Sequence, residues 1–311
     1  NDLGSLRENE DRACLFVEMK LDAKGRKKGH RFSRGLMRSA AKLSYQDAQK
    51  IIEGAPAPRA IGENVRHLHA AYRARLEERA HRAPLDLELV ERRVVLGADG
   101  KVERIEKRER FDAHRLIEEF MILANIAAAE TLEEKRYALI YRIHDAPDPE
   151  RVDATRDYLE SLGYSLARSA LRPAQFNQIL AIAGGRGEKE MISEVVLRTQ
   201  RQAEYSTENV GHFGLIIPRY AHFTSPIRRY ADLAVHRALV AAARLGKGAQ
   251  TAEEAQELAR TAEMISDFER RAMAAERESK DRYPADSLSG RVGAEFDGRI
   301  RGVTRFGLFV M

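Results

Sequence analysis

Hydrophobic and polar positions alternate near the start of this 311-residue chain. Residues 17–21 place apolar side chains at every second position, which predicts a half-buried strand. We expect the strand to turn at Lys24-Gly25 and to return through residues 30–36 as a hairpin. Asp99-Gly100 predicts the turn of a second hairpin.

Helical spacing replaces this alternation in four places. One helix is predicted from about Tyr45, and another across residues 61–76, where apolar side chains recur every three or four positions. Residues 116–132 are apolar on nearly every side, which is typical of a helix buried inside a large domain. Thr251 and Glu254 have capping-box spacing and predict the start of a long helix. The strands and helices together predict an α+β fold with one large mixed domain.

Composition narrows the class of protein. Lys and Arg number 53 against 48 Asp and Glu, a formal charge of only +5, so attraction for nucleic acid has to come from clustered charges. Cys14 is the single cysteine, which excludes an internal disulfide framework and a cysteine zinc site. No apolar stretch reaches about 18 residues, so we expect no membrane span. A reducing cytoplasm is the expected compartment.

The segment from residue 222 to residue 232 carries the strongest chemical signal. Ser225 is a favourable helix N-cap and Pro226 a favourable first helical residue, which would place Arg228 and Arg229 in the first turn. Free backbone amides and two guanidinium groups would then converge on one place, as at a phosphate or carboxylate site. The plain alternative is a capped helix in which Arg228 pairs with Asp232.

Other polar residues have equally plain alternatives. Asn125 lies in the buried helix, where it either ties backbone together or reaches a substrate channel. The three histidines His144, His212 and His222 lack His-x-x-x-His spacing, so we interpret them as contacts of a bound ligand or structural residues and not as a metal triad.

Five segments resemble, in order, the motifs of the ribonuclease II and ribonuclease R family, the RNB family. Pro147 makes the third of them more similar to the ribonuclease R branch. The segments are Arg38–Tyr45, Leu116–Asn125, Tyr141–Pro147, Gly211–Leu215 with His222–Asp232, and Ala275–Arg277.

The resemblance implies a processive hydrolase that degrades RNA from a single-stranded 3′ end to nucleoside 5′-monophosphates, with structured RNA as a further expected substrate. It also implies Mg²⁺, held by aspartates in a D-x-D-D type motif. This chain has no such cluster, so we expect the metal ligands upstream of Asn1 and none within the chain. The expected protein is monomeric, binds RNA and no membrane, and works in the cytoplasm.

The resemblance also divides the chain. It implies an RNB-like catalytic domain over residues 1–287 and the beginning of an OB-type RNA-binding barrel over residues 288–311. Alternating apolar residues across 292–300 and 303–310 fit its first two strands. Phe306 and Phe309 are either RNA-stacking residues or core residues.

The family's site residues carry over to matching positions. Arg228 matches the transition-state arginine, and Glu276 belongs beside the active site. Tyr45 matches an aromatic residue that stacks on a base, and its plain alternative is a core tyrosine at a helix start. The remaining expected RNA contacts are Asn125, His212, Ser225 and Arg229.

Spacing alone favours other partners for some of these residues. Glu276 falls at the edge of an apolar helical stripe, where a partly buried carboxylate would pair with Arg271, Arg277 or Lys280. Adjacent helical side chains point about 100° apart, so Arg228 and Arg229 cannot both face one phosphate. The alternative function is an inactive RNB-like RNA-binding or regulatory protein.

Overall fold

The computed structural model describes residues 2, 4–87, 89, 91–98, 102–167, 171–289, 291–298, 300–304 and 307–310. The chain forms two compact units. The first comprises Asn1–Val90 with Glu109–Glu269, and the second Glu91–Arg108 with Arg270–Met311. These units are defined by contacts within the chain. The expected boundary between a catalytic domain and an OB-type barrel, at residues 287 and 288, is not tested by them and stays a prediction.

The predicted first hairpin is confirmed. Strands β1 (Asp11–Leu21) and β2 (Lys27–Arg38) pair antiparallel, with Val17 opposite Phe32. Gly25 in the turn has φ +71°, and a Cβ added there would lie 2.4 Å from the Ala74 carbonyl oxygen. Arg75 Nη1 donates to the Gly25 carbonyl at 2.7 Å. The hairpin turn therefore lies directly against the helix that carries Ala74.

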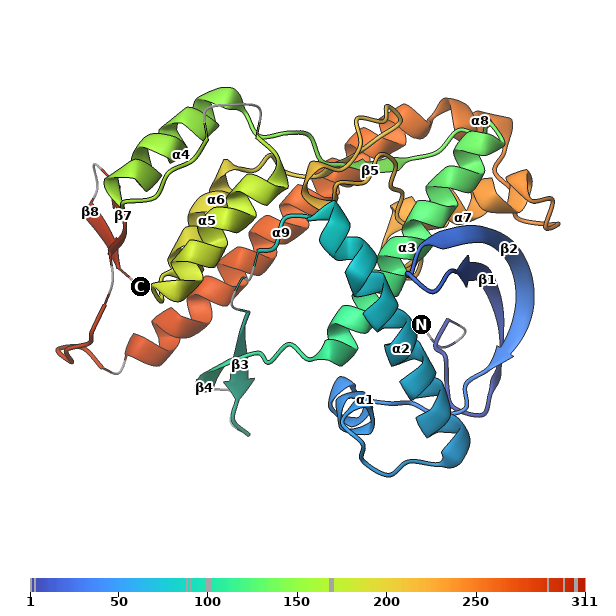
Figure 1. The fold of residues 1–311 in the computed structure, drawn as a ribbon, viewed down its shortest axis with the longest axis horizontal. Coiled ribbons are helices and arrows are strands. Elements are labelled where there is room, and N and C mark those ends of the chain that lie inside the picture. The colour runs from blue at the N-terminus through green and yellow to red at the C-terminus, as the bar shows by residue number, and fades with distance from the viewer. Residues whose placement is uncertain are drawn as a thin grey trace. The chain divides into compact units, whose positions relative to one another are not determined.

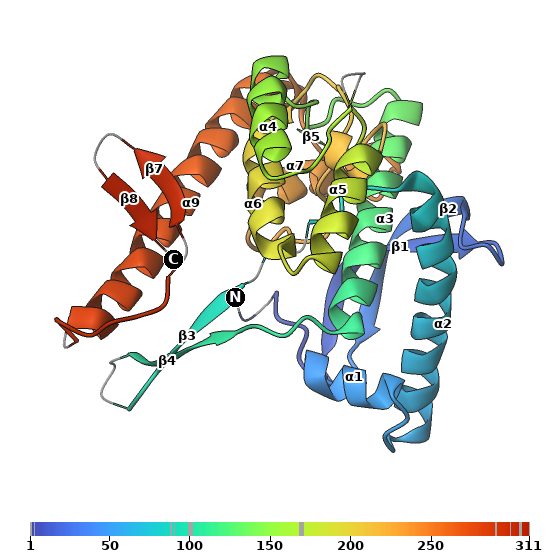
Figure 2. The ribbon, with the colours of Figure 1, turned by 60° about the vertical axis from the view of Figure 1, so that its left-hand side comes forward.

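Three of the predicted helices lie beside this hairpin in the first unit and pack against one another (Figures 1 and 2). They are α1 (Tyr45–Ile52), α2 (Arg59–Arg82) and α3 (Asp112–Glu134). Ser44 begins α1 as its N-cap, because its side chain accepts a hydrogen bond from the Asp47 amide. Twelve residues of α3 are buried, as its nearly continuous apolar sequence predicts.

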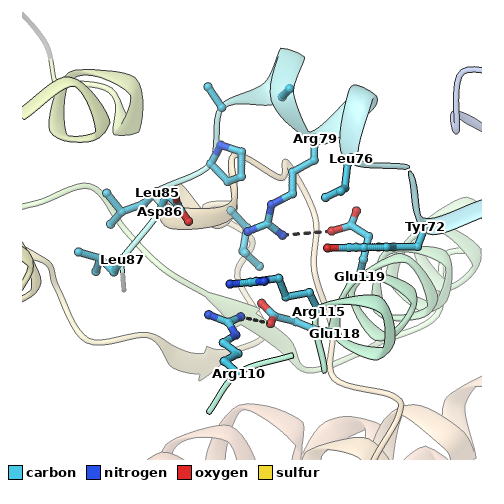
Figure 3. Close-up of a pocket in the computed structure, with 14 residues that line it drawn as sticks. Tyr72, Leu76, Arg79, Leu85, Asp86, Leu87, Arg110, Arg115, Glu118 and Glu119 are labelled. Atoms are coloured by element: carbon cyan, nitrogen blue, oxygen red, sulfur yellow. Dashed lines mark hydrogen bonds and ion pairs between the residues drawn. The ribbon is translucent and has the colours of Figure 1, made fainter. Parts of the chain in front are cut away.

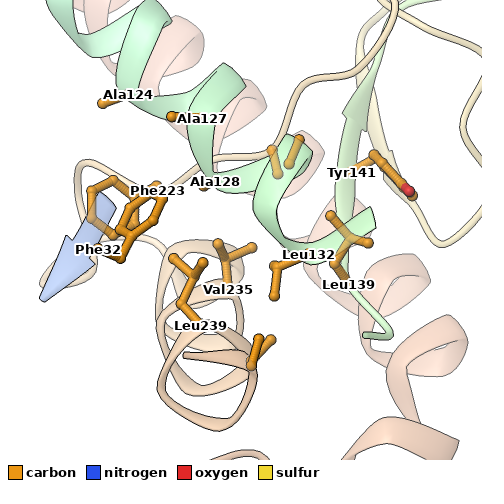
Figure 4. Packing of buried hydrophobic residues seen from close by; sticks show 14 of the residues in the cluster. Phe32, Ala124, Ala127, Ala128, Leu132, Leu139, Tyr141, Phe223, Val235 and Leu239 are labelled. Carbon is orange, nitrogen blue, oxygen red and sulfur yellow. The ribbon is translucent and has the colours of Figure 1, made fainter. Parts of the chain in front are cut away.

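The main core forms where α3 packs against α7 (Tyr230–Ala242) (Figure 4). Ala127, Ala128 and Leu132 of α3 are fully buried, as are Val235 and Leu239 of α7. Alanine side chains on α3 let the two helices approach closely, because they add little volume to the interface. Phe32 of the hairpin and Phe223 cap one end of this core.

A second group of helices has its own core. In both ribbon views α4 (Pro149–Ser161), α5 (Pro173–Gly185) and α6 (Lys189–Thr199) gather together. Phe176 is fully buried at the centre of their cluster. Short strands β5 (Tyr141–Ile143) and β6 (Glu204–Ser206) pair antiparallel beside the segment that carries the expected site.

The predicted capping box at Thr251 is confirmed, but it begins the short helix α8 (Ala252–Gln256). Thr251 Oγ1 accepts from the Glu254 amide at 3.2 Å, and the Glu254 carboxylate accepts from the Thr251 amide at 2.9 Å. The long helix α9 (Leu258–Ser289) follows one residue later.

Two hairpins contribute to the second unit: β3 (Arg92–Leu96) with β4 (Val102–Lys107), and β7 (Ile300–Thr304) with β8 (Gly307–Val310). The strand expected across 292–300 is wrong over residues 292–298, which form no strand, with Gly293 at φ +90° and Val292 93% exposed. Asp99, Gly100, Phe306 and the Phe309 side chain lie outside the described residues.

The α+β class is confirmed. Every named sheet among the described residues has two strands, and none of them closes into a barrel. No helix in the described part of the chain is long and apolar enough to cross a membrane.

Candidate nucleic-acid interface

The Ser225–Arg229 segment forms a turn and not the predicted start of a helix. The amides of Arg228 and Arg229 both donate to the Ser225 carbonyl, at 3.2 and 3.1 Å, and α7 begins only at Tyr230. Arg229 is the N-cap residue, with an extended backbone at φ −129° and ψ 121°. The prediction that Ser225 caps the helix and that both arginines stand in its first turn is wrong.

Asp232 explains why the helix starts late. Its carboxylate is fully buried and accepts hydrogen bonds from the Ser225 amide at 2.7 Å and from Arg229 Nε and Nη2 at 2.7 and 2.9 Å. A buried carboxylate needs a counter-charge and several donors. Drawing Arg229 back to Asp232 keeps the Arg229 backbone out of the helical conformation.

Arg228 differs from its neighbour. It is exposed, and it forms no hydrogen bond or ion pair with any residue that the structure describes. The plain alternative in which Arg228 pairs with Asp232 is therefore wrong, because Arg229 holds that place. The Arg228 guanidinium is free to meet an anion.

The loop that leads to this turn is fixed by Asn125, which is 2% exposed. Its side-chain oxygen accepts from the Phe223 amide at 2.8 Å, and its nitrogen donates to Tyr220 Oη at 2.9 Å. Of the two interpretations of Asn125, the structure supports the one in which it ties backbone together. His236 adds a contact to the Phe223 carbonyl at 2.7 Å.

His222 lies in a cationic setting beside the turn. Its Nδ1 is 2.9 Å from Tyr205 Oη, and the Arg142 guanidinium lies 4.6 Å from the centre of the Tyr205 ring. Burial, followed by the charges of Arg229 and Arg142, lowers the pKa of His222 to about 2. The imidazole is therefore neutral. Arg142 pairs with Glu269 at 2.6 Å and Arg229 with Asp232, so among the described residues Arg228 is the nearby arginine without an acidic partner.

His144 and His212 hold the Gly211–Leu215 loop together. The two rings are 4.9 Å apart, and the Gly214 amide donates to His144 Nδ1 at 3.1 Å. Burial lowers the pKa of His212 to about 3, and its Nδ1 accepts from the Leu215 amide. Both histidines thus have structural partners, and the expected RNA contact of His212 stays a prediction.

Tyr45 is half-exposed at the first position of α1. Its ring stacks on His114, with centroids 3.9 Å apart and planes inclined by 17°, and Phe111 continues the stack on His114 at 5.6 Å. Tyr45 is 40% exposed, so part of its ring remains open to a further flat group. The expected stacking of Tyr45 on an RNA base stays a prediction.

Glu276 is exposed on α9, and its carboxylate pairs with Lys280 one turn later at 2.5 Å. The expected partial burial at the edge of an apolar stripe is wrong, because Phe268 and Ala272 on the same face are also exposed. The alternative of a pair with a neighbouring cation is confirmed for Lys280. Glu276 and Arg228 belong to different units, so a shared site stays a prediction.

A cavity of about 460 Å³ in the first unit contains charged residues that the sequence analysis missed. The guanidinium groups of Arg79, Arg110 and Arg115 gather in it, and Glu118 and Glu119 lie beside them (Figure 3). Arg79 pairs with Glu119 at 3.1 Å, and Arg110 pairs with Glu118.

A sequence signal for part of this cluster exists. Arg75, Arg79 and Arg82 lie one turn apart on α2 and all approach Glu119, which is 1% exposed. Two adjacent carboxylates inside an otherwise apolar helix indicate that a cationic face packs against it.

A divalent metal needs several oxygen or nitrogen ligands close together. No group of three His, Cys, Asp or Glu side chains that could hold a metal ion occurs in the described part of the chain. The buried carboxylates of Asp232 and Glu119 are both occupied by guanidinium groups. The described residues therefore do not fit a catalytic metal.

Comparison with known proteins decides the family. A model of the RNB domain matches residues 1–244. The chain belongs to the RNB family. Ribonuclease R of Vibrio cholerae is 37% identical over 324 residues, which cover 100% of this chain and 40% of that protein. Ribonuclease R of Aquifex aeolicus is 40% identical over 314 residues, 99% of this chain and 44% of that protein.

Solved structures of an RNB protein share the fold of this chain. Mycoplasma genitalium RNase R in complex with ribose methylated single-stranded RNA has a TM-score of 0.93 and 26% identity, over 100% of this chain and 50% of that chain. The complex of the same protein with double-stranded RNA has a TM-score of 0.91 and covers 56% of that chain. The chain spans less than half the length of its curated relatives.

Proposed function

We propose that this chain is part of a processive 3′-to-5′ exoribonuclease that hydrolyses RNA to nucleoside 5′-monophosphates. The observation that carries the proposal is the free Arg228 guanidinium on a turn held by the buried Asp232, within an RNB domain. The ribonuclease R relatives, at 37 and 40% identity, support it.

Arg228 is assigned to the phosphate about to be cleaved. A guanidinium fork there neutralises the negative charge that builds on the nonbridging oxygens in the transition state. By analogy with other arginine clamps, its removal lowers the rate by roughly 10³-fold. Ser225 contributes through its backbone, because its carbonyl and amide both hold the turn that presents Arg228.

Tyr45 is assigned to a base of the RNA. Stacking on its partly open ring accepts every base and suits an enzyme without sequence preference. Asn125 supports the same site by fixing the Phe223 backbone just before the turn. His212 and Glu276 are assigned to the RNA path on their family positions alone.

The proposed cofactor is a divalent metal, Mg²⁺, which would activate water for attack on the phosphorus. The described residues lack a fitting ligand group, so the proposal places no metal ligand among them. The proposed substrate is RNA with a single-stranded 3′ end, and the complexes of M. genitalium RNase R with single-stranded and double-stranded RNA support an extension to structured RNA. We propose a monomer that works in the cytoplasm.

The test uses the whole protein and a 5′-labelled RNA with a single-stranded 3′ end. With Mg²⁺ the RNA should shorten stepwise to a short limit product and release nucleoside 5′-monophosphates, which chromatography identifies. Internal cleavage products would contradict the proposal. RNA that is bound and left intact with every divalent metal would support the alternative, an inactive RNB-like RNA-binding protein.

A further inference from the structure

The two adjacent arginines of the turn are in different environments. Arg229 is 18% exposed at its side chain and forms a two-pronged pair with Asp232, while Arg228 is exposed and forms no such pair among the described residues. Arg229 is extended at φ −129°, and its guanidinium is directed inward to a fully buried carboxylate. Two arginines that are adjacent in the sequence therefore have different neighbours in the fold.

Asp232 joins both ends of the turn. One carboxylate oxygen accepts from the Ser225 amide and from Arg229 Nη2, and the other accepts from Arg229 Nε. With these bonds in place, the backbone between residues 225 and 229 has little freedom, and Arg228 stands within that segment. The direction of the Arg228 side chain thus depends on Asp232.

A phosphate contact through Nε or Nη2 of Arg229 would require this arrangement to break, because both atoms donate to Asp232. If the Arg229 guanidinium turned toward RNA, Asp232 would remain buried without a counter-charge, which is strongly unfavourable. Arg228 can bind an anion without any such loss, because it gives up only its contact with water.

We propose that Arg229 and Asp232 form a positioning pair that holds the Ser225–Arg229 turn, and that Arg228 alone contacts the RNA phosphate. This inference rests on the proposed RNA-degrading function. It revises the expectation that Arg229 binds RNA directly.

Asp232→Asn distinguishes the two roles of Arg229 by the sign of its effect. The change removes the carboxylate that holds Arg229 and raises the net charge of the chain. If Arg229 positions the turn, the variant binds single-stranded RNA about tenfold more weakly, because Arg228 loses its direction. If Arg229 contacts phosphate, releasing it tightens binding and steepens the salt dependence. The test uses the whole protein and a fluorescent single-stranded RNA with divalent metal chelated, so that the RNA stays intact, and anisotropy is measured at several salt concentrations.

A double variant tests whether Asp232 acts through Arg228. Arg228→Gln alone is expected to weaken RNA binding about tenfold and to reduce the slope of log K against log salt by roughly 0.7. Adding Asp232→Asn to it should bring little further loss. If the two changes weaken RNA binding by independent factors that multiply in the double variant, Asp232 acts elsewhere and the proposal is overturned.

Arg229→Lys covers the case in which Asp232→Asn does not fold. Lysine keeps the positive charge but cannot form the two-pronged pair. Positioning predicts weaker binding by about threefold or more, whereas a phosphate contact predicts binding near that of the unaltered chain. Glu254→Gln is the matched control, because it removes a carboxylate that pairs with Arg237 of α7 at 2.8 Å and should leave RNA binding unchanged.

Two failures remain separable. If the unaltered whole protein binds no single-stranded RNA, the proposed function fails and this inference fails with it. If the chain binds RNA but Asp232→Asn binds it more tightly, only the division of roles between Arg228 and Arg229 is overturned.

Discussion

Single buried polar residues determine how the loop before the turn is held. The sequence indicates that Asn125 needs partners, because it lies in an apolar helix. It does not indicate which partners, since Tyr220 and the Phe223 amide are almost a hundred residues away. Arg229 and Asp232 show the same limit at short range, because only the fold reveals which of two adjacent arginines the carboxylate takes.

Asn125→Leu should lower the free energy of unfolding by about 1–3 kcal/mol, because it leaves the Phe223 amide buried and unpaired. Tyr220→Phe removes only the other bond and should cost about 1 kcal/mol. Urea unfolding followed by circular dichroism measures both. An Asn125→Leu variant as stable as the unaltered chain would contradict the assignment.

Tyr45→Ala should weaken single-stranded RNA binding by about 1–3 kcal/mol, through the loss of one stacking surface. Tyr45→Phe keeps the ring and should bind like the unaltered chain. Anisotropy titrations with RNA of several sequences provide the measurement. If phenylalanine and alanine weaken binding equally, the hydroxyl and not the ring carries the contact.

At the scale of elements, local sequence signals predicted the first hairpin and the helices from Tyr45, across residues 61–76 and across residues 116–132. These elements have clear periodicity or caps. The sequence predicted the start of α7 too early, because Ser225 and Pro226 are strong local signals for a helix start. The contacts of Asp232 with Ser225 and Arg229 form only in the folded loop, so the sequence did not reveal them. Residues 292–298 alternate like a strand but form none, and the side chains of Val292 and Phe296 are exposed.

The alanine face of α3 sets the distance to α7. Ala128 is fully buried in that interface, so Ala128→Leu should destabilise the chain by about 1–3 kcal/mol through overpacking. Ala154→Leu on the exposed face of α4 is the matched control and should change stability by less than about 0.5 kcal/mol. Thermal or urea unfolding of both variants provides the measurement. An Ala128→Leu variant as stable as Ala154→Leu would show that the interface between α3 and α7 is loosely packed.

At the scale of the molecule, the α+β class and the RNB family follow from the sequence, while the division into two compact units does not. Hydrophobic periodicity and sequence motifs describe continuous stretches of chain, whereas a compact unit is defined by contacts between residues far apart in the sequence. The pairing of Arg75, Arg79 and Arg82 with Glu119 was missed for the same reason.

Stability should fall as the pH is lowered from 7.5 to 5.5. Burial lowers the pKa of His222 to about 2 and that of His212 to about 3, while unfolded histidines titrate near about 6.5. The unfolded chain therefore binds protons that the folded chain does not. The stabilisation is complete above about pH 6.5 and declines below it by up to about 1.4 kcal/mol per pH unit for each histidine.

Urea unfolding at a series of pH values measures this slope. His222→Gln should reduce it, because glutamine does not titrate and can still hydrogen-bond Tyr205 Oη. An unchanged slope in the variant would show that His222 is not among the groups responsible.

The contact between the first hairpin and α2 leaves space for a hydrogen atom and nothing larger, since the nearest backbone oxygen would be 2.4 Å from a methyl carbon at residue 25. Gly25→Ala is therefore a candidate for a conditional allele. Cells that depend on this protein should grow when cool and stop when warmed, and the rate at which activity disappears after a temperature shift would report how long the protein is needed.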